Sequence, residues 1–309
     1  MKNLPDHFRV LDEIQRALTN DSPVVALEST VITHGLPAPH TLRLARAMEA
    51  GARSRGATPA TIAILDGLVR IGLTDAELES LAGNPAIKVS LRDFATSLTK
   101  KINGGTTVAG TMFAAHKVGI KVFATGGIGG VHKESRMDIS TDMQALATIP
   151  MIVVCAGAKS ILDLPATLEY LETMGVPVLG YGTDEFPAFF SRHSGLKVSA
   201  RVDSPQEVAA FARAHWGLGL QSGILVCQPI PEEFEIPREN IDPIEEQASQ
   251  EAIEKRIGGQ ALTPFLLQRV NELSGGRSMR ANISFLLNNA GLAAEIAKPM
   301  TAPIKMRSV

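Results

Sequence analysis

Reactive side chains gather directly after two apolar strands, which we expect over residues 121–125 and 151–156. The first strand leads into a glycine-rich segment, and the second leads into a short turn. The side chains in these two segments are those of His132, Asp138, Ser140, Asp142 and Lys159. Ligands of open α/β sheets bind beyond the carboxyl ends of the strands. We therefore expect an amine, carboxylates, a hydroxyl and an imidazole to share one site.

Lys159 is the candidate nucleophile. A lysine amine attacks a carbonyl carbon only when it is neutral, and burial beside positive charge lowers its pKa enough for this. The apolar strand before Lys159 places it near the core. The alternative is a solvated loop lysine. A phosphate-binding loop is excluded, because Ala158 and Val153 stand where that motif requires glycine.

Asp138, Ser140 and Asp142 alternate at a spacing of two, so in an extended segment they would project to one side. Two carboxylates and a hydroxyl suit a hard cation such as magnesium or manganese. Alternatively, Asp138 and Ser140 cap a helix that starts near Asp142. The glycines of 126–130 do not complete a dinucleotide fingerprint, because the last required glycine is replaced by His132. We expect them to let backbone amides approach an anion or a sugar.

Glu28 ends a predicted apolar strand over 24–27. A carboxyl group beside an apolar run can have a raised pKa and act as a general acid; the alternative is an ion pair with an arginine. Lys88 and Arg92, together with the turn 106–107 before a predicted helix, are candidates for holding a phosphate. The alternative for both basic residues is simple solvation.

Short apolar runs alternate with helical periods along most of the chain. This pattern predicts a three-layer α/β/α fold with a central, mostly parallel sheet. Further strands are expected at 60–65, 87–90, 176–181 and 223–228, and helices at 40–55, 74–81 and 107–118.

After residue 231 the chain is more charged. We expect additional C-terminal helices there, starting at Asp242-Pro243 and Thr263-Pro264, with a last one over 278–298. No linker or repeat is visible, so we expect a single domain over residues 1–309.

The composition narrows the possible partners. The 309 residues are 45% hydrophobic, carry a formal charge of −2, and include one Trp and two Tyr. A basic patch and stacking aromatics, typical of nucleic-acid-binding proteins, are therefore not expected. No apolar run is long enough to cross a bilayer, and the N-terminus does not resemble a signal peptide. We expect a cytoplasmic protein that binds neither nucleic acid nor membrane, with Cys155 and Cys227 as buried free thiols.

Together these segments resemble the pseudouridine-5′-phosphate glycosidases of the indigoidine synthase A-like family, in order and over nearly the whole chain. The segments that carry the resemblance are 24–30, 59–64, 88–90, 106–109, 124–132, 138–140, 153–163, 229–232 and 263–267.

The resemblance implies a metal-dependent enzyme that reversibly cleaves the carbon–carbon bond of pseudouridine 5′-phosphate, giving uracil and ribose 5-phosphate. Glu28 would act as proton donor and open the ribose ring, and Lys159 would be the nucleophile that forms an imine with its first carbon. Uracil would then leave, and water would release the sugar phosphate. The resemblance further implies one manganese or other divalent ion per subunit, and a homotrimer.

By position in the motifs, the resemblance makes Asp138 the metal ligand. The implied substrate contacts are Lys88, Val108, His132, Ser140, Thr141, Asp142 and Asn282. The segment between His132 and Asp138 is shorter than the usual family loop, which puts metal affinity and closure of the site in question.

Two other functions fit the same residues. One is a Schiff-base lyase or aldolase that acts on another sugar phosphate, which would form a lysine adduct but no uracil. The other is a non-catalytic sugar-phosphate-binding protein, which would form neither. The presence of both Glu28 and Lys159 favours an enzyme.

Overall fold

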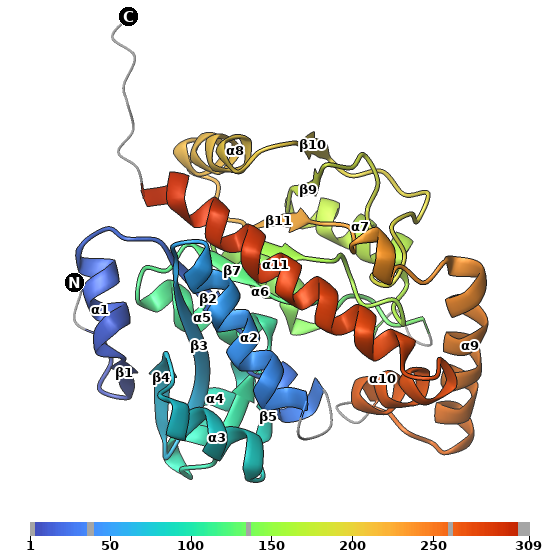
Figure 1. The fold of residues 1–309 in the computed structure, drawn as a ribbon, viewed down its shortest axis with the longest axis horizontal. Helices are drawn as coiled ribbons and strands as arrows, with labels where there is room; N and C mark the ends of the chain where they lie inside the picture. The colour runs from blue at the N-terminus through green and yellow to red at the C-terminus, as the bar shows by residue number, and fades with distance from the viewer. Residues whose placement is uncertain (1–3, 36–39, 134–136, 259–261, 302–309) are drawn as a thin grey trace, which may run out of the picture.

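The computed structural model describes residues 4–35, 40–133, 137–258 and 262–301. Its centre is an eleven-stranded sheet with the order β1-β4-β3-β2-β7-β8-β11-β9-β10, to which β5 and β6 are added beside β3 (Figure 1). The strands are β1 Phe8–Val10, β2 Val24–Leu27, β3 Thr58–Leu65, β4 Leu68–Ile71, β5 Ile87–Val89, β6 Gly104–Thr106, β7 Val122–Ala124, β8 Ile152–Cys155, β9 Val178–Tyr181, β10 Ala200–Val202 and β11 Ile224–Cys227. Within these residues, no helix combines the length and apolarity needed to span a bilayer.

The predicted mostly parallel sheet is confirmed. The central neighbours β2, β7, β8 and β11 all pair in parallel. β3 pairs in parallel with β2 through its first half, and antiparallel with β4 and β6 through its second half. The carboxyl ends of β2, β7 and β8 therefore lie side by side at one edge of the sheet.

Helices cover both faces of this sheet, as the three-layer prediction requires. In Figure 1, α2 and α11 lie in front of the central strands, whereas α5 and α6 lie behind them. The main helices are α1 Asp12–Thr19, α2 His40–Ser54, α3 Asp75–Gly83, α4 Phe94–Thr99, α5 Val108–Lys117, α6 Thr141–Thr148, α7 Leu164–Thr173, α8 Pro205–Gly217, α9 Arg238–Glu254, α10 Leu262–Leu273 and α11 Arg277–Thr301. Short single-turn segments are η1 Val31–Gly35, η2 Leu91–Asp93 and η3 Glu232–Phe234.

Local sequence explains several helix starts. Thr74 caps α3 in a reciprocal capping box with Glu77. Thr107 caps α5 by accepting a hydrogen bond from the Gly110 amide at 3.2 Å. These side chains satisfy amide groups that a helix leaves unpaired at its first turn.

The predicted starts of two C-terminal helices are wrong. α9 begins at Arg238, after Pro237, so Asp242 is not its N-cap and Pro243 lies inside the helix. The earlier turn forms because Ile241 is buried against the core, and this packing outweighs the missing amide of Pro243. Thr263 likewise lies within α10, whose described part starts at Leu262.

Both faces of the sheet contribute to one main apolar core. Cys155 and Cys227 are fully buried, free thiols on neighbouring strands, in agreement with the prediction. The short strands β1, β4, β6 and β10 were not expected. β6 consists of Gly104, Gly105 and Thr106, a composition that carries little strand signal.

Candidate active site

Three neighbouring parallel strands deliver the central groups of the site. Glu28 directly follows β2, Thr125 directly follows β7, and Lys159 lies four residues beyond the end of β8. Glu28 and Lys159 line one cavity of about 320 Å³ at the carboxyl ends of these strands. The convergence predicted from the sequence is therefore present in the structure.

All but one of the predicted site residues line this cavity. They are Glu28, Lys88, Val108, His132, Asp138, Ser140, Thr141, Asp142 and Lys159. The exception is Asn282, which lies near the start of α11 and lines a neighbouring cavity of about 400 Å³ with His34 and Gln268. It faces that cavity because α10 lies against this end of α11.

Asn289 lies on the same face of α11 as Asn282, seven residues further along the helix. Asn289 contacts the sheet. It is fully buried, and its side-chain amide donates to the Thr125 carbonyl oxygen at 2.8 Å. The last helix therefore holds the end of β7, where the chain enters the site.

Glu28 is a buried carboxyl group that is only 6% exposed. The hydroxyls of Thr30 and Thr125 each donate a hydrogen bond to one of its two oxygens. Burial raises the pKa of Glu28, while the nearby Lys159 ammonium and the two hydroxyls oppose the rise. The result is a carboxyl group above its ordinary pKa and next to an amine, as a general acid requires. The predicted alternative, an arginine partner for Glu28, is not what the structure shows.

Lys159 is half-buried and stands on a turn that the backbone fixes. Gly157 has φ +91°, and a Cβ there would lie 2.3 Å from the Pro187 carbonyl oxygen, so the turn requires glycine. The Lys159 amide donates to the Ile128 carbonyl oxygen at 3.1 Å, which joins this turn to the glycine-rich segment after β7.

Lys88 brings a second cation to the cavity from β5. Burial, and then the Lys159 ammonium, lower the pKa of Lys88, while Asp142 and Glu28 oppose the shift. The two amines are thus close enough to repel each other. Burial and like charge together therefore favour the neutral form of the Lys88 amine.

The two aspartates of the predicted metal motif have different surroundings. The carboxylate of Asp142 is buried and accepts hydrogen bonds from the Ala109 amide and the Gly129 amide, both at 2.9 Å. Asp138 is exposed at the rim of the cavity. Asp142 therefore ties together α5, α6 and the glycine-rich segment, whereas Asp138 lies at the exposed rim.

The expectation that residues 138–142 form one extended run is wrong. Ser140 is the N-cap of α6, and its hydroxyl accepts a hydrogen bond from the Asp142 amide at 3.2 Å. Asp142 itself lies in the first turn of that helix. The helix forms because its cap and its apolar residues Met143 and Leu146 favour it more than an extended run. The capping alternative is confirmed for Ser140.

The glycine-rich segment packs mainly against protein. A Cβ on Gly127 would lie 2.5 Å from the Phe189 ring, and one on Gly130 would lie 2.4 Å from the Thr167 hydroxyl. The Gly129 amide is already bonded to Asp142. The expectation that these glycines bring amides to a ligand is therefore wrong for Gly129, and close packing explains the others.

Groups that suit an anion lie on the side of the cavity formed by β5 and α5. Lys88, Ser90, Arg92 and Thr107 all line it there. Val108, the first residue of α5, also lines the cavity, at a helix end where amide groups point outward. These are the residues predicted to hold a phosphate, now on one wall.

Sequence reasoning missed Thr30 and Thr125, which bind the carboxyl group of Glu28. Their signal was available in part, because Thr125 is the first polar residue after an apolar strand, at the site edge of the sheet. Thr263, from the C-terminal helices, also lines the cavity.

The chain matches the model of the indigoidine synthase A like proteins over residues 13–299. It belongs to this family. Among curated members, it is 52% identical to the pseudouridine-5′-phosphate glycosidase of Solibacter usitatus, over 94% of this chain and 98% of that protein. It is 53% identical to the protein of that name from Paracoccus denitrificans, over 96% of this chain and 99% of that one.

Two solved structures are also similar to this chain. The indigoidine synthase A-like protein of Thermotoga maritima has a TM-score of 0.89 and 36% identity, and covers 98% of this chain and 100% of its own. The prealnumycin C-glycosynthase AlnA, solved in complex with ribulose 5-phosphate, has a TM-score of 0.89 and 39% identity, with 96% and 98% covered.

Proposed function

We propose that this protein reversibly cleaves the carbon–carbon glycosidic bond of pseudouridine 5′-phosphate, giving uracil and D-ribose 5-phosphate. The observation that carries the proposal is the pairing of a buried carboxyl group, Glu28, with an amine, Lys159, in one cavity. Relatives that share about half of their residues over nearly the full length are named for this activity.

Glu28 is the proton donor in this reaction. Its proton goes to the ring oxygen of the ribose, and the ring opens at the first carbon. Since the raised pKa keeps more of the carboxyl group protonated, burial serves this step directly. The hydroxyls of Thr30 and Thr125 can rotate, so one of them accepts while Glu28 carries its proton.

Lys159 is the nucleophile. Its neutral amine bonds to the first carbon of the opened sugar and gives a covalent amine adduct. When the carbon–carbon bond breaks, its electron pair goes to the uracil carbon, and the nitrogen lone pair forms the imine between Lys159 and the pentose. The uracil carbon takes up a proton, and uracil leaves. One water then hydrolyses the imine, which frees Lys159 and ribose 5-phosphate, so that one water is consumed per turnover.

The remaining residues of the cavity bind substrate. We place the phosphate against Lys88, Arg92 and the start of α5 at Val108, because cations and a helix N-terminus attract anions. His132, Ser140, Thr141 and Asp142 also line the cavity, and we place the sugar and the base against them. Asn282 lies outside this cavity, so its substrate contact stays a prediction.

Asp138 is the residue that we propose to hold manganese or another divalent cation. Within the described part of the chain, no three His, Cys, Asp or Glu side chains form a metal-binding group. Such ions, however, are also held through a single carboxylate, with water and substrate phosphate as the other ligands. The exposed carboxylate of Asp138 at the cavity rim fits this mode. A bound cation would neutralise negative charge on the substrate.

Two variants, Asp138→Asn and Asp142→Asn, distinguish a loss of metal binding from a loss of stability. The first variant should keep the wild-type unfolding midpoint and require more manganese for half-maximal activity. The second should be less stable by about 1–3 kcal/mol, because it breaks a hydrogen bond to a buried amide. Equal manganese requirements in the wild type and Asp138→Asn would contradict the assigned metal ligand.

The direct test follows uracil release from pseudouridine 5′-phosphate with manganese present. Wild-type protein should form uracil, and Lys159→Ala should not, while its circular dichroism stays unchanged. Lys121→Ala is the matched control, because Lys121 is exposed at the other end of β7. Borohydride added during turnover should leave a pentose phosphate adduct on Lys159, detectable by peptide mass spectrometry. Turnover by Lys159→Ala would exclude the proposed nucleophile.

A second candidate function follows from the AlnA structure, which holds a different sugar phosphate, ribulose 5-phosphate. It is carbon–carbon bond chemistry on that sugar with an acceptor other than uracil. A borohydride adduct with ribulose 5-phosphate, without uracil release or uptake, would favour it. The higher identity to the named glycosidases favours the first function.

We also propose a cytoplasmic homotrimer with one metal ion per subunit. The trimer is measured by light scattering, where it should give three times the chain mass of 32.9 kDa.

A further inference from the structure

A second carboxyl group is buried on the other side of the Lys159 turn. Glu245, on α9, is 3% exposed, although it plays no part in the proposed reaction. It belongs to the buried stripe of α9 with Ile241, Ala248 and Ala252. A glutamate in such a stripe is costly unless it has a purpose or a partner.

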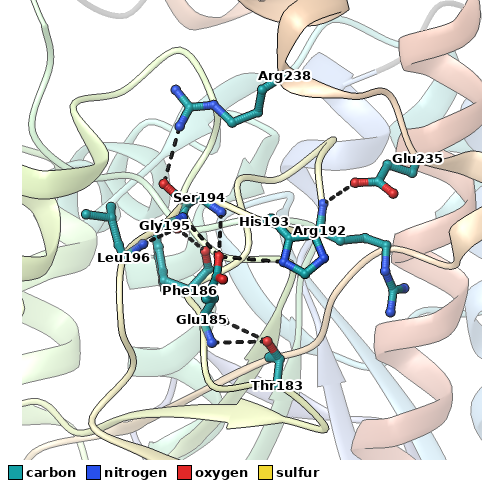
Figure 2. Close-up of polar contacts among 10 residues, drawn as sticks. All are labelled: Thr183, Glu185, Phe186, Arg192, His193, Ser194, Gly195, Leu196, Glu235 and Arg238. Atoms are coloured by element: carbon teal, nitrogen blue, oxygen red, sulfur yellow. Dashed lines mark hydrogen bonds and ion pairs between the residues drawn. The ribbon is translucent and has the colours of Figure 1, made fainter.

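Glu245 lines its own cavity of about 580 Å³, separate from the one that contains Glu28. The loop 183–196 forms one wall of it through Ser191 and Ser194. Figure 2 shows how this wall is held: the Arg238 guanidinium donates to the Ser194 carbonyl oxygen at 3.4 Å, and the Glu185 carboxylate accepts from the Ser194 amide at 3.2 Å.

The Ser160 hydroxyl lies close to the Glu245 carboxyl group in the same cavity. Ser160 is buried, lines the same cavity, and directly follows Lys159 in the chain. Ser160 Oγ and Glu245 Oε1 are both buried and have no partner at hydrogen-bonding geometry within the described residues. The hydroxyl is nevertheless near enough to lower the pKa of the carboxyl group. A small movement of α9 would close this contact.

We propose that Glu245 is a positioning residue that holds the Lys159–Ser160 turn through the Ser160 hydroxyl. On its other side the same turn is held by the Lys159 amide, which donates to the Ile128 carbonyl oxygen at 3.1 Å. With Glu245 in place, α9 secures the turn from behind and fixes where the Lys159 amine enters the active-site cavity. This inference rests on the proposed function of Lys159 and extends it.

The charge of Glu245 makes this contact depend on pH. Burial raises the pKa of Glu245 to about 7. The charged groups around it are Lys133 after β7, Asp163 before α7, and Arg238, Asp242 and Glu246 on α9 itself. From the loop 183–196, only uncharged residues line the cavity. An ionised Glu245 accepts a charge-assisted hydrogen bond from Ser160, which is stronger than a neutral one.

The experiment compares wild type with Glu245→Gln, Ser160→Ala and the double variant, using uracil release between pH 5.5 and 8.5 (roughly 1.5 units either side of the Glu245 pKa). We expect kcat of the wild type to fall as the pH drops through about 7, because Glu245 then becomes neutral. Both single variants should lack this fall, with kcat lower by about ten-fold at pH 8 and KM little changed. The double variant should be no slower than the slower single variant. Glu239→Gln changes an exposed glutamate of α9 that does not line this cavity, so it is the matched control and should behave as wild type.

The same four proteins are unfolded in urea, which requires no substrate. Coupled effects of the two substitutions on the unfolding midpoint would establish the Ser160–Glu245 contact even if the wild type released no uracil, in which case the proposed function fails and the contact stands. The positioning role is overturned if Glu245→Gln keeps the wild-type pH profile, or if the two substitutions reduce kcat independently. The positioning role is also overturned if the effects of the two substitutions are coupled in the unfolding midpoint but not in kcat.

Discussion

Glu28 and Glu245 are two buried carboxyl groups on opposite sides of one lysine turn, and their surroundings differ. Glu28 receives two threonine hydroxyls and lies beside the Lys159 ammonium. Glu245 is affected by one hydroxyl, that of Ser160, and it lines a separate cavity of mixed polar and apolar side chains. Burial raises the pKa of both groups. The comparison shows that burial alone does not assign a role to a carboxyl group.

The two carboxyl groups differ in what their protons can reach. Glu28 opens onto the cavity that holds Lys88, Lys159 and the anion-binding wall, so its proton can reach a bound sugar. Glu245 faces only the back of the turn, and its proton can affect the reaction only through Ser160. One carboxyl group is thus placed for chemistry and the other for geometry.

The largest effect is expected from Glu28→Gln, which removes the acid and keeps its shape. General acids contribute about 10²- to 10⁴-fold, so kcat should fall by about that factor. Since the protonated form is active, kcat of the wild type should decline as pH rises through the raised pKa of Glu28, and the variant should lack this decline. Glu49→Gln, which alters another glutamate whose pKa burial raises, is the control in steady-state assays of uracil release. An unchanged kcat in Glu28→Gln would contradict the role of Glu28 as general acid, and with it the proposed difference between Glu28 and Glu245.

A smaller effect is expected on stability from Glu245→Gln. The pKa of Glu245 is raised from 4.5 to about 7 in the folded chain, so its contribution to stability is complete below pH 4.5 and lost as pH rises through 7. At about 1.4 kcal/mol per pKa unit, wild type should lose about 3 kcal/mol between pH 5 and 9 from this group. Glutamine does not titrate, so the variant should keep most of this stability. Urea unfolding at both pH values measures the difference, and an equal loss in both proteins would show that Glu245 is not buried as described.

The smallest effect is expected from Thr125→Val, which removes one hydroxyl from Glu28 without changing the side-chain shape. That hydroxyl lowers the pKa of Glu28, so its loss should move the alkaline limb of the kcat profile to higher pH. A shift of up to about one pH unit is expected for a hydrogen bond with a net value near 1 kcal/mol. Thr61→Val serves as control, because the Thr61 hydroxyl binds Glu49, which does not line the site. A shift to lower pH would contradict the described hydrogen bond.

Local signals account for the parts of the molecule that could be predicted. The strands β2, β8 and β11 are short apolar runs, and the reactive residues directly after strands meet because parallel strands end at one edge. β6 was missed because two of its three residues are glycine, and its strand pairing comes from β3 and β5. The sequence thus indicates an element only when that element carries its own pattern.

The carboxylates were the hardest part to predict. The role of Asp142 depends on the amides of Ala109 and Gly129, which lie far from it in the chain and which no spacing rule connects to it. The burial of Glu245 is indicated by the sequence pattern, because it shares one helical face with Ile241, Ala248 and Ala252. What that face packs against was decided only by the tertiary structure.

The hydrogen bond from Asn289 to the Thr125 carbonyl oxygen affects when the site is completed during synthesis of the chain. A ribosome adds α11 after all the described strands of the sheet, yet this helix lies across β2, β7 and β8 and anchors the residue that touches Glu28. A nascent chain that has formed the sheet but does not yet include α11 lacks this hydrogen bond. Under the proposed function, the site is therefore complete only after α11 has been synthesised as far as Asn289 and has packed on the sheet.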